Sequence, residues 1–114
     1  TDYFQIFTSG VDTSQNVVGV VPGEGRLAGQ WIVIGAHYDA VGFRWITPDS
    51  AEVNNGADDN ASGTSLLLEL ARGWAARAAA HAGFEVERRS LMFQAFGAEE
   101  EGLIGSNYFC SHPL

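Results

Sequence analysis

Cysteine is nearly absent from this sequence of 114 residues, which contains Cys110 alone. A single cysteine excludes an internal disulfide framework and any cysteine-rich zinc finger. Basic residues are also scarce: six Lys and Arg stand against 14 Asp and Glu, so the formal net charge is −8 at pH 7. Because such a chain is repelled by nucleic-acid phosphates and by anionic membrane surfaces, we expect neither as a partner.

Long apolar runs are absent too: none approaches the roughly 18 residues that a membrane-spanning helix needs. The first residues (TDYF) carry no basic segment followed by an apolar one, which is the pattern of a signal peptide. Hydrophobic residues still make up 46% of the chain, which is enough for one core, whereas 114 residues are too few for two ordinary domains. We expect residues 1–114 to form one soluble globular unit. Residue 1 is Thr rather than an initiator Met, and we expect both ends to be cuts in a longer domain.

Strand and helix signals alternate along the chain, which is typical of an α/β layer structure. Short apolar segments bounded by Gly, Pro or Ser predict strands at residues 4–8, 16–21, 31–36 and 88–96. Apolar residues three and four apart, followed by Gly83, predict a helix over residues 62–81, and a second helix is expected to begin near residue 104. Turn formers without periodicity predict a loop over residues 42–56.

Three clusters of potential metal ligands follow buried strands or precede the long helix. They are His37 with Asp39, Asp58 with Asp59, and the run from Glu99 to Glu101. Carboxylates gathered at one sheet edge repel one another unless cations lie among them. Imidazole and carboxylate ligands without a thiolate suit zinc or a similar divalent ion in a catalytic site, whereas calcium prefers oxygen ligands alone.

Each cluster taken alone also has a structural explanation. His37 could be a buried histidine that is hydrogen-bonded to a backbone carbonyl. Asp58 and Asp59 could cap the helix, and residues 99–101 could form a solvated turn. All three explanations would have to hold at once, so we favour the metal site. The sequence contains neither a His-Glu-x-x-His motif nor a Gly-x-Ser-x-Gly turn.

Three blocks of the sequence resemble successive signatures of the M28 family of zinc peptidases, whose members are mostly aminopeptidases with two metal ions. The blocks are residues 34–39 (IGAHYD), 56–63 (GADDNASG) and 96–106 (FGAEEEGLIGS). Residues 16–19 and 22–23 resemble the segment that precedes the first block. The resemblance implies a three-layer α/β/α sandwich with a mixed sheet, similar to phosphorylases and hydrolases, of which residues 1–114 form the first half of a single domain.

The same resemblance implies hydrolysis of the N-terminal residue from peptides by a water molecule that zinc activates. His37 would bind one zinc, Asp59 would bridge two zinc ions, and Glu100 would bind the other. Glu99 would be the general base. Asp39, two residues beyond His37 on an extended chain, is expected to orient the imidazole.

Further expectations accompany the resemblance. Asp58 would assist helix capping, Glu101 would lie on the surface, and the Asp59–Asn60 peptide bond would be cis. The protein would be secreted or periplasmic. An Asp and a His that complete the family's ligand set have no counterpart here, and neither His81 nor His112 is placed to substitute. We therefore expect the 114 residues alone to bind zinc weakly, to show little or no activity, and to associate through an exposed sheet edge.

Two other functions stay open. The first is a glutaminyl-cyclase-like acyltransferase, which resembles the family and uses one zinc. The second is a receptor-type relative that keeps the fold without catalysis. The presence of His37, Asp59, Glu99 and Glu100 together argues against the second.

Overall fold

The computed structural model describes residues 3–10, 12–83 and 86–114. Within these ranges the strands are β1 (Phe4–Ser9), β2 (Asp12–Val21), β3 (Trp31–His37), β4 (Gly42–Thr47), β5 (Ser50–Asn54) and β6 (Ser90–Phe96). The helices are α1 (Gly63–Ala80) and α2 (Ile104–Ser111), with a 3₁₀ turn at Gly25–Leu27 and a wound segment at Ala57–Ser62. No helix in the described ranges is both long enough and apolar enough to cross a membrane.

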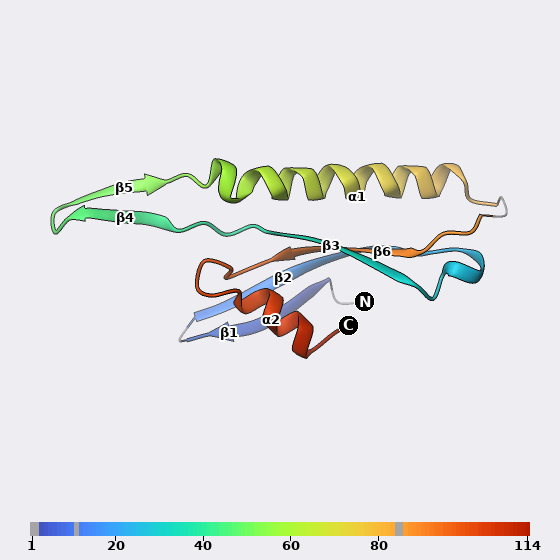
Figure 1. The fold of residues 1–114 in the computed structure, drawn as a ribbon, viewed down its shortest axis with the longest axis horizontal. Coiled ribbons are helices and arrows are strands. Elements are labelled where there is room, and N and C mark those ends of the chain that lie inside the picture. The colour runs from blue at the N-terminus through green and yellow to red at the C-terminus, as the bar shows by residue number, and fades with distance from the viewer. Residues whose placement is uncertain (1–2, 11, 84–85) are drawn as a thin grey trace.

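Four strands form a mixed sheet in the order β1-β2-β6-β3. The pairs β1–β2 and β2–β6 are antiparallel, whereas β3 and β6 run parallel. A parallel pair needs a long crossover connection, and α1 belongs to the segment that supplies it (Figure 1). Because β3 and β6 are parallel, their last residues, His37 and Phe96, pair at the same edge of the sheet. This edge is where the sequence analysis placed its metal ligands.

The two helices cover opposite faces of the sheet. Leu91 and Phe93 of β6 pack with Leu67 of α1 in the main hydrophobic core. Phe96 points to the opposite face of β6 and packs against Phe109 of α2, with the two rings tilted and their centroids 6.3 Å apart. Successive side chains of a strand point to opposite faces, so α1, the sheet and α2 form the three predicted α/β/α layers.

The α2 face of the sheet is only partly covered. On this face Val20, Trp31 and Val33 are 42%, 51% and 49% exposed. A cavity of about 670 Å³ opens there, with Val20, Trp31 and Met92 in its lining. Exposed apolar surface of this kind favours association of the chain with a second copy or another protein. That association stays a prediction.

The predicted helix over residues 62–81 and the four predicted strands are confirmed, with shifts of a few residues at their ends. The prediction of a loop over residues 42–56 is wrong. Strands β4 and β5 form a hairpin that extends beyond the main sheet (Figure 1). Phe43 and Trp45 pair with Val53 and Ala51 on one face of this hairpin. The turn formers mark only its two-residue tip, and the alternating apolar residues on either side were overlooked.

Candidate metal centre

The candidate site lies where β3 and β6 end and α1 begins. His37 is the last residue of β3, Asp59 lies in the wound segment before α1, and Glu99 and Glu100 follow β6 in the turn that leads to α2. Carboxyl ends of parallel strands lie at one edge of a sheet, and this is why residues distant in sequence meet here.

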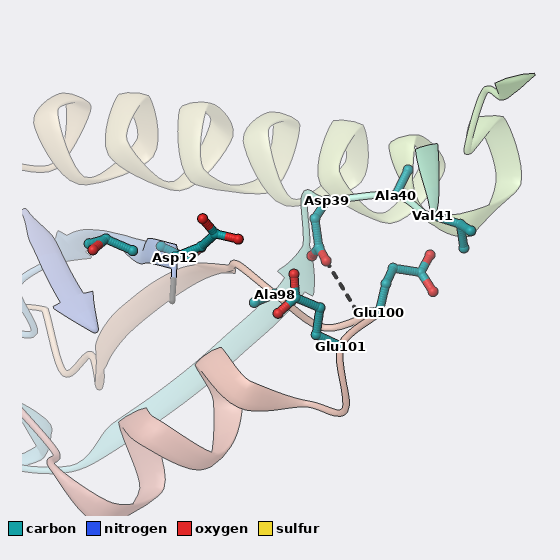
Figure 2. Close-up of a pocket in the computed structure, with 9 residues that line it drawn as sticks. Asp12, Asp39, Ala40, Val41, Ala98, Glu100 and Glu101 are labelled. Atoms are coloured by element: carbon teal, nitrogen blue, oxygen red, sulfur yellow. Dashed lines mark hydrogen bonds between the residues drawn. The ribbon is translucent and has the colours of Figure 1, made fainter. Parts of the chain in front are cut away.

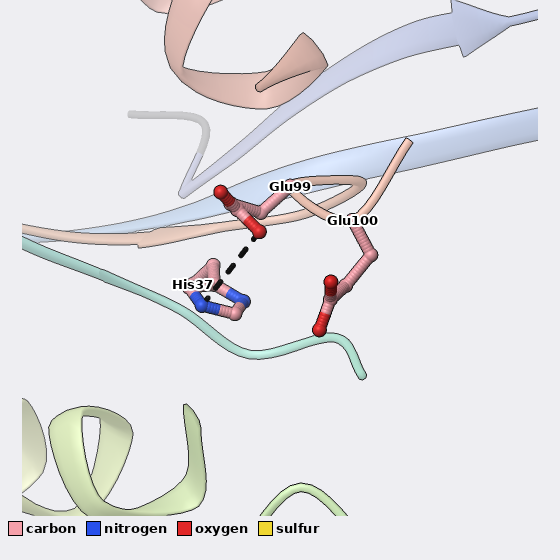
Figure 3. Close-up of side chains that lie close together, drawn as sticks. All are labelled: His37, Glu99 and Glu100. Carbon is pink, nitrogen blue, oxygen red and sulfur yellow. Dashed lines mark ion pairs between the residues drawn. The ribbon is translucent and has the colours of Figure 1, made fainter. Parts of the chain in front are cut away.

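The imidazole of His37 is the centre of the cluster. Its Nε2 lies 2.9 Å from Asp59 Oδ1. The same Nε2 lies 3.8 Å from Glu99 Oε2 (Figure 3). Ligand atoms of His37, Glu99 and Glu100 all lie within 4.8 Å of one another. The structure thus brings together the four residues that the sequence analysis named for metal binding and catalysis. It also places Glu99, named there only as a base, among the atoms able to hold an ion.

Asp39 connects the imidazole to the turn after β6. Its Oδ1 lies 3.5 Å from His37 Nδ1, and both atoms are buried with no hydrogen-bond partner in the part of the chain that the structure describes. Its Oδ2 accepts a hydrogen bond of 3.1 Å from the backbone N–H of Glu100 (Figure 2). Nε2 therefore faces the other carboxylates while Nδ1 faces Asp39, an arrangement that is usual for histidines that bind metals.

The surroundings of His37 act on its pKa in both directions. Burial of the ring, the largest influence, lowers the pKa because it penalises the charged form. The hydrogen bond with Asp59 raises the pKa, and so do the negative charges of Glu99, Asp39 and Asp59. These contributions together outweigh burial, so the pKa of His37 lies above its ordinary value of 6.5.

The wound segment that carries Asp59 is irregular. The N–H of Ala61 donates to the carbonyl of Gly56, which gives a π-type turn, while Asp59 and Asn60 have non-helical backbone angles. The Asp59–Asn60 peptide bond is cis, as expected. The first turn of α1 is capped by Asn60 Oδ1, which accepts from Gly63 N at 2.9 Å. Asp58 contributes its backbone carbonyl instead, to the hydroxyl of Ser62.

The turn at residues 98–103, here called the acidic turn, carries Glu99 to Glu101. The N–H groups of Leu103 and Ile104 donate to the carbonyls of Glu99 and Ala98, at 2.8 and 3.1 Å. Ala98 and Leu103 have left-handed backbone angles, with φ of 54° and 60°. That conformation costs roughly 1–2 kcal/mol in a residue with a Cβ. Contacts outside the turn must therefore hold it in this shape.

Thr64 is a positioning residue that the sequence analysis missed. Its hydroxyl donates a hydrogen bond of 2.7 Å to the backbone carbonyl of His37 and so fixes the end of β3 to α1. A threonine in the first turn of a helix is common, and only the fold shows which carbonyl it faces.

A cavity of about 390 Å³ adjoins the cluster (Figure 2). Its lining includes four carboxylates, those of Asp12, Asp39, Glu100 and Glu101. Asp39 and Glu100 thus belong both to the cluster and to the cavity. A lining with this much negative charge favours a cationic group over an anionic one.

The donor set fits zinc or a similar divalent ion. One imidazole nitrogen and carboxylate oxygens converge from three separate elements, and no thiol takes part. The buried Nδ1 of His37, with Asp39 beside it, leaves Nε2 facing the carboxylates.

The sequence is similar to several larger proteins. It is 35% identical over 100 residues to aminopeptidase YwaD of Bacillus subtilis, a match that covers 88% of this chain and 18% of that protein. It is 46% identical over 79 residues to the human BOS complex subunit NCLN, which covers 60% of this chain and 12% of that protein. The chain thus spans less than a fifth of the length of either relative.

A solved structure and a family profile also match the chain. The fold matches the crystal structure of BSAP, a zinc aminopeptidase from Bacillus subtilis, with a TM-score of 0.64 and 33% identity, over 92% of this chain and 21% of that one. The profile of peptidase family M28 matches residues 16–114. The chain belongs to peptidase family M28.

Proposed function

We propose that this chain carries the general base and part of the metal centre of a zinc-dependent aminopeptidase, which removes the N-terminal residue from peptides. The observation that carries the proposal is the convergence of His37, Asp59, Glu99 and Glu100 at one sheet edge. Membership of peptidase family M28, and similarity to proteins named as aminopeptidases, support the same chemistry.

Each residue of the cluster has a separate role in this proposal. His37 would hold one zinc through Nε2, Glu100 would hold a second, and Asp59 would contribute its carboxylate to both. Bound there, zinc supplies a Lewis acid that polarises the scissile carbonyl and makes a water molecule more acidic. Glu99 takes the proton of the attacking water and passes it to the leaving amine. Asp39 keeps the ring of His37 in the orientation that points Nε2 at the carboxylates.

The acidic cavity beside the cluster favours an aminopeptidase over a carboxypeptidase. The free amino terminus of a peptide is cationic or neutral, whereas its carboxyl terminus is an anion that the carboxylates of Asp12, Glu100 and Glu101 would repel. Substrates in the proposal are therefore peptides that enter with the amino terminus first.

The metal centre is tested by titrating the chain with Co²⁺, which reports coordination through its visible absorption, and then displacing Co²⁺ with Zn²⁺. We expect weak binding, because only two proposed protein ligands face each ion, whereas a catalytic zinc usually has three. Absence of any saturable Co²⁺ spectrum up to millimolar metal would overturn the proposal.

The role of Glu99 is tested with Glu99→Gln, which keeps the shape of the side chain and removes the base. Hydrolysis of an aminoacyl chromogenic amide with excess Zn²⁺ is expected to be slow and to fall by about 10²–10⁴-fold in the variant. The control is Glu69→Gln, an exposed glutamate of α1 that pairs with Arg72 outside the site, for which we expect no loss. Turnover that survives Glu99→Gln would show that the base lies elsewhere.

A second candidate function follows from the similarity to the BOS complex subunit NCLN, whose name describes a subunit rather than an enzyme. Under this alternative the chain takes part in a protein assembly and needs no metal. It predicts no saturable Co²⁺ spectrum, so the same titration separates the two functions.

A further inference from the structure

Asn16 is a buried polar residue in the middle of β2, where strands usually carry apolar side chains. Its side chain is fully buried, with 0% exposure. A buried amide destabilises a fold unless its hydrogen bonds are satisfied. The partners of Asn16 therefore indicate what it does.

The amide of Asn16 bonds to both ends of the acidic turn. Its Oδ1 accepts from the N–H of Gly97, at 3.2 Å, and its Nδ2 donates to the carbonyl of Gly105, at 2.8 Å. Nδ2 also donates to Gln5 Oε1, at 2.8 Å. Gly97 precedes the turn and Gly105 follows it, and the N–H of Gly105 donates to the carbonyl of Gly97. Asn16 thus clamps the neck of the loop that carries Glu99 and Glu100.

The neck is too tight for side chains of its own. A Cβ on Gly105 would overlap both the carbonyl of Gly97 and Oδ1 of Asn16. The backbone segments must therefore approach each other closely, and Asn16 fills the remaining space with matching donors and acceptors. The acidic turn contains two residues in left-handed conformations, Ala98 and Leu103, and so needs an anchor of this kind.

A second buried amide on the same face of the sheet has no such connection. Gln94 of β6 pairs with Val18 and is also 0% exposed. Among the described residues, its Nε2 donates a hydrogen bond only to Met92 Sδ, at 3.5 Å, and its Oε1 has no hydrogen-bond partner. The two buried amides in neighbouring strands therefore differ in their hydrogen bonds: Asn16 is bonded to both sides of the acidic turn, and Gln94 is not.

We propose that Asn16 is a positioning residue for the metal centre: by clamping the neck at Gly97 and Gly105, it fixes the direction in which Glu99 and Glu100 present their carboxylates. The expected effect of Asn16 on zinc affinity rests on the proposed function, because that function supplies the zinc site. Its structural part, the order of the acidic turn, is measured separately.

The test compares Asn16→Leu with Gln94→Leu, since Leu resembles the shape of an amide side chain without its hydrogen bonds. In Asn16→Leu we expect amide exchange at Leu103, Ile104 and Gly105 to be at least tenfold faster. We also expect the dissociation constant for Zn²⁺ to rise by roughly tenfold, as for other groups that orient ligands. Gln94→Leu should change neither quantity.

A second variant, Gly105→Ala, tests the clamp from its other side. Alanine favours the helical backbone of α2, yet its methyl group would push Asn16 and Gly97 apart. We expect the same faster exchange and the same weaker zinc binding as in Asn16→Leu. If neither variant melts cooperatively, the proposal is wrong, because Asn16 would then support the whole sheet rather than the turn.

The remaining outcomes separate this proposal from the proposed function. Faster exchange with unchanged zinc affinity would overturn the positioning role, and so would equal losses in Gln94→Leu. If the unaltered chain binds no Zn²⁺, the proposed function fails and the positioning role with it. Amide exchange would still show whether Asn16 clamps the acidic turn.

Discussion

The acidic turn after β6 and the wound segment before α1 each bring a carboxylate to His37, but the protein holds them differently. The acidic turn is bound at its neck by Asn16, inside by its own backbone hydrogen bonds, and at Glu100 N by Asp39. Asp59 projects from its segment with its side chain 77% exposed, and its carboxylate is hydrogen-bonded to His37.

The acidic turn is therefore the preformed half of the site. The wound segment is the half whose carboxylate, that of Asp59, depends on His37 for its orientation. The backbone that carries Glu99 is held by hydrogen bonds that do not involve the His37 side chain. Asp59 gains its orientation from the imidazole, and in the proposed function from the metal. The wound segment itself remains fixed by Asn60 and Ser62, so only the carboxylate of Asp59 is free to adjust.

The largest effect is expected from His37→Ala, because His37 contacts both halves of the site. We expect zinc affinity to fall by more than roughly a hundredfold, beyond the 10–100-fold typical of groups that only orient a ligand. Calorimetric titration with Zn²⁺ measures this, with His81→Ala, at the far end of α1, as the control. Equal losses in the two variants would show that binding is not specific to the cluster.

Asp39→Asn is expected to weaken zinc binding by about tenfold, since the neutral amide no longer holds His37 Nδ1–H by charge. The substitution acts on the preformed half of the site, because Asp39 also accepts a hydrogen bond from the backbone N–H of Glu100 in the acidic turn. Asp58→Asn, in the other half, is the matched control and should leave affinity unchanged. A larger loss in Asp58→Asn than in Asp39→Asn would reverse the comparison.

The raised pKa of His37 predicts a pH dependence of the metal-free chain. A pKa above the ordinary value means that protonated His37 stabilises the fold. That stabilisation is complete below about pH 6.5, the ordinary value, and is lost as the pH rises through the raised pKa. The melting temperature should therefore fall as the pH rises above about 6.5. The fall should be smaller in Asp59→Asn, and an unchanged fall would mean that Asp59 does not support the charged imidazole.

The smallest effect is expected from Thr64→Val, which removes the hydrogen bond to the carbonyl of His37. We expect a loss of about 1 kcal/mol in the free energy of unfolding, typical of one hydrogen bond. Chemical denaturation measures the loss, and Thr64→Ser should restore most of it. No rescue by Ser would indicate that the methyl group of Thr64, rather than its hydroxyl, matters.

The sequence was sufficient to predict those features that depend on local pattern. Apolar runs located β3 and β6, and residues three and four apart located α1. Because potential metal ligands were predicted directly after both buried strands, the sequence alone indicated that His37 lies near Glu99 and Glu100. The roles of these residues in metal binding and catalysis stay predictions.

The features that were missed depend on contacts across the fold. Asn16 and Gly105, whose carbonyl it binds, are 89 residues apart along the chain, so no local sequence pattern predicts their contact. Thr64 and the carbonyl of His37 are likewise separated by 27 residues. The β4–β5 hairpin is a different case: its alternation of apolar residues was present, and the Pro48–Asp49 tip was given too much weight.

The central position of β6 has a consequence for the order of folding. β6 lies between β2 and β3, although it follows both in the sequence. Until residues 90–96 have left the ribosome, the β1–β2 ribbon and β3 have no strand to join them, and a lone two-stranded ribbon is marginally stable. Pairings between such distant segments form slowly. Because the acidic turn follows β6 directly, the step that closes the sheet also delivers Glu99 and Glu100 to His37.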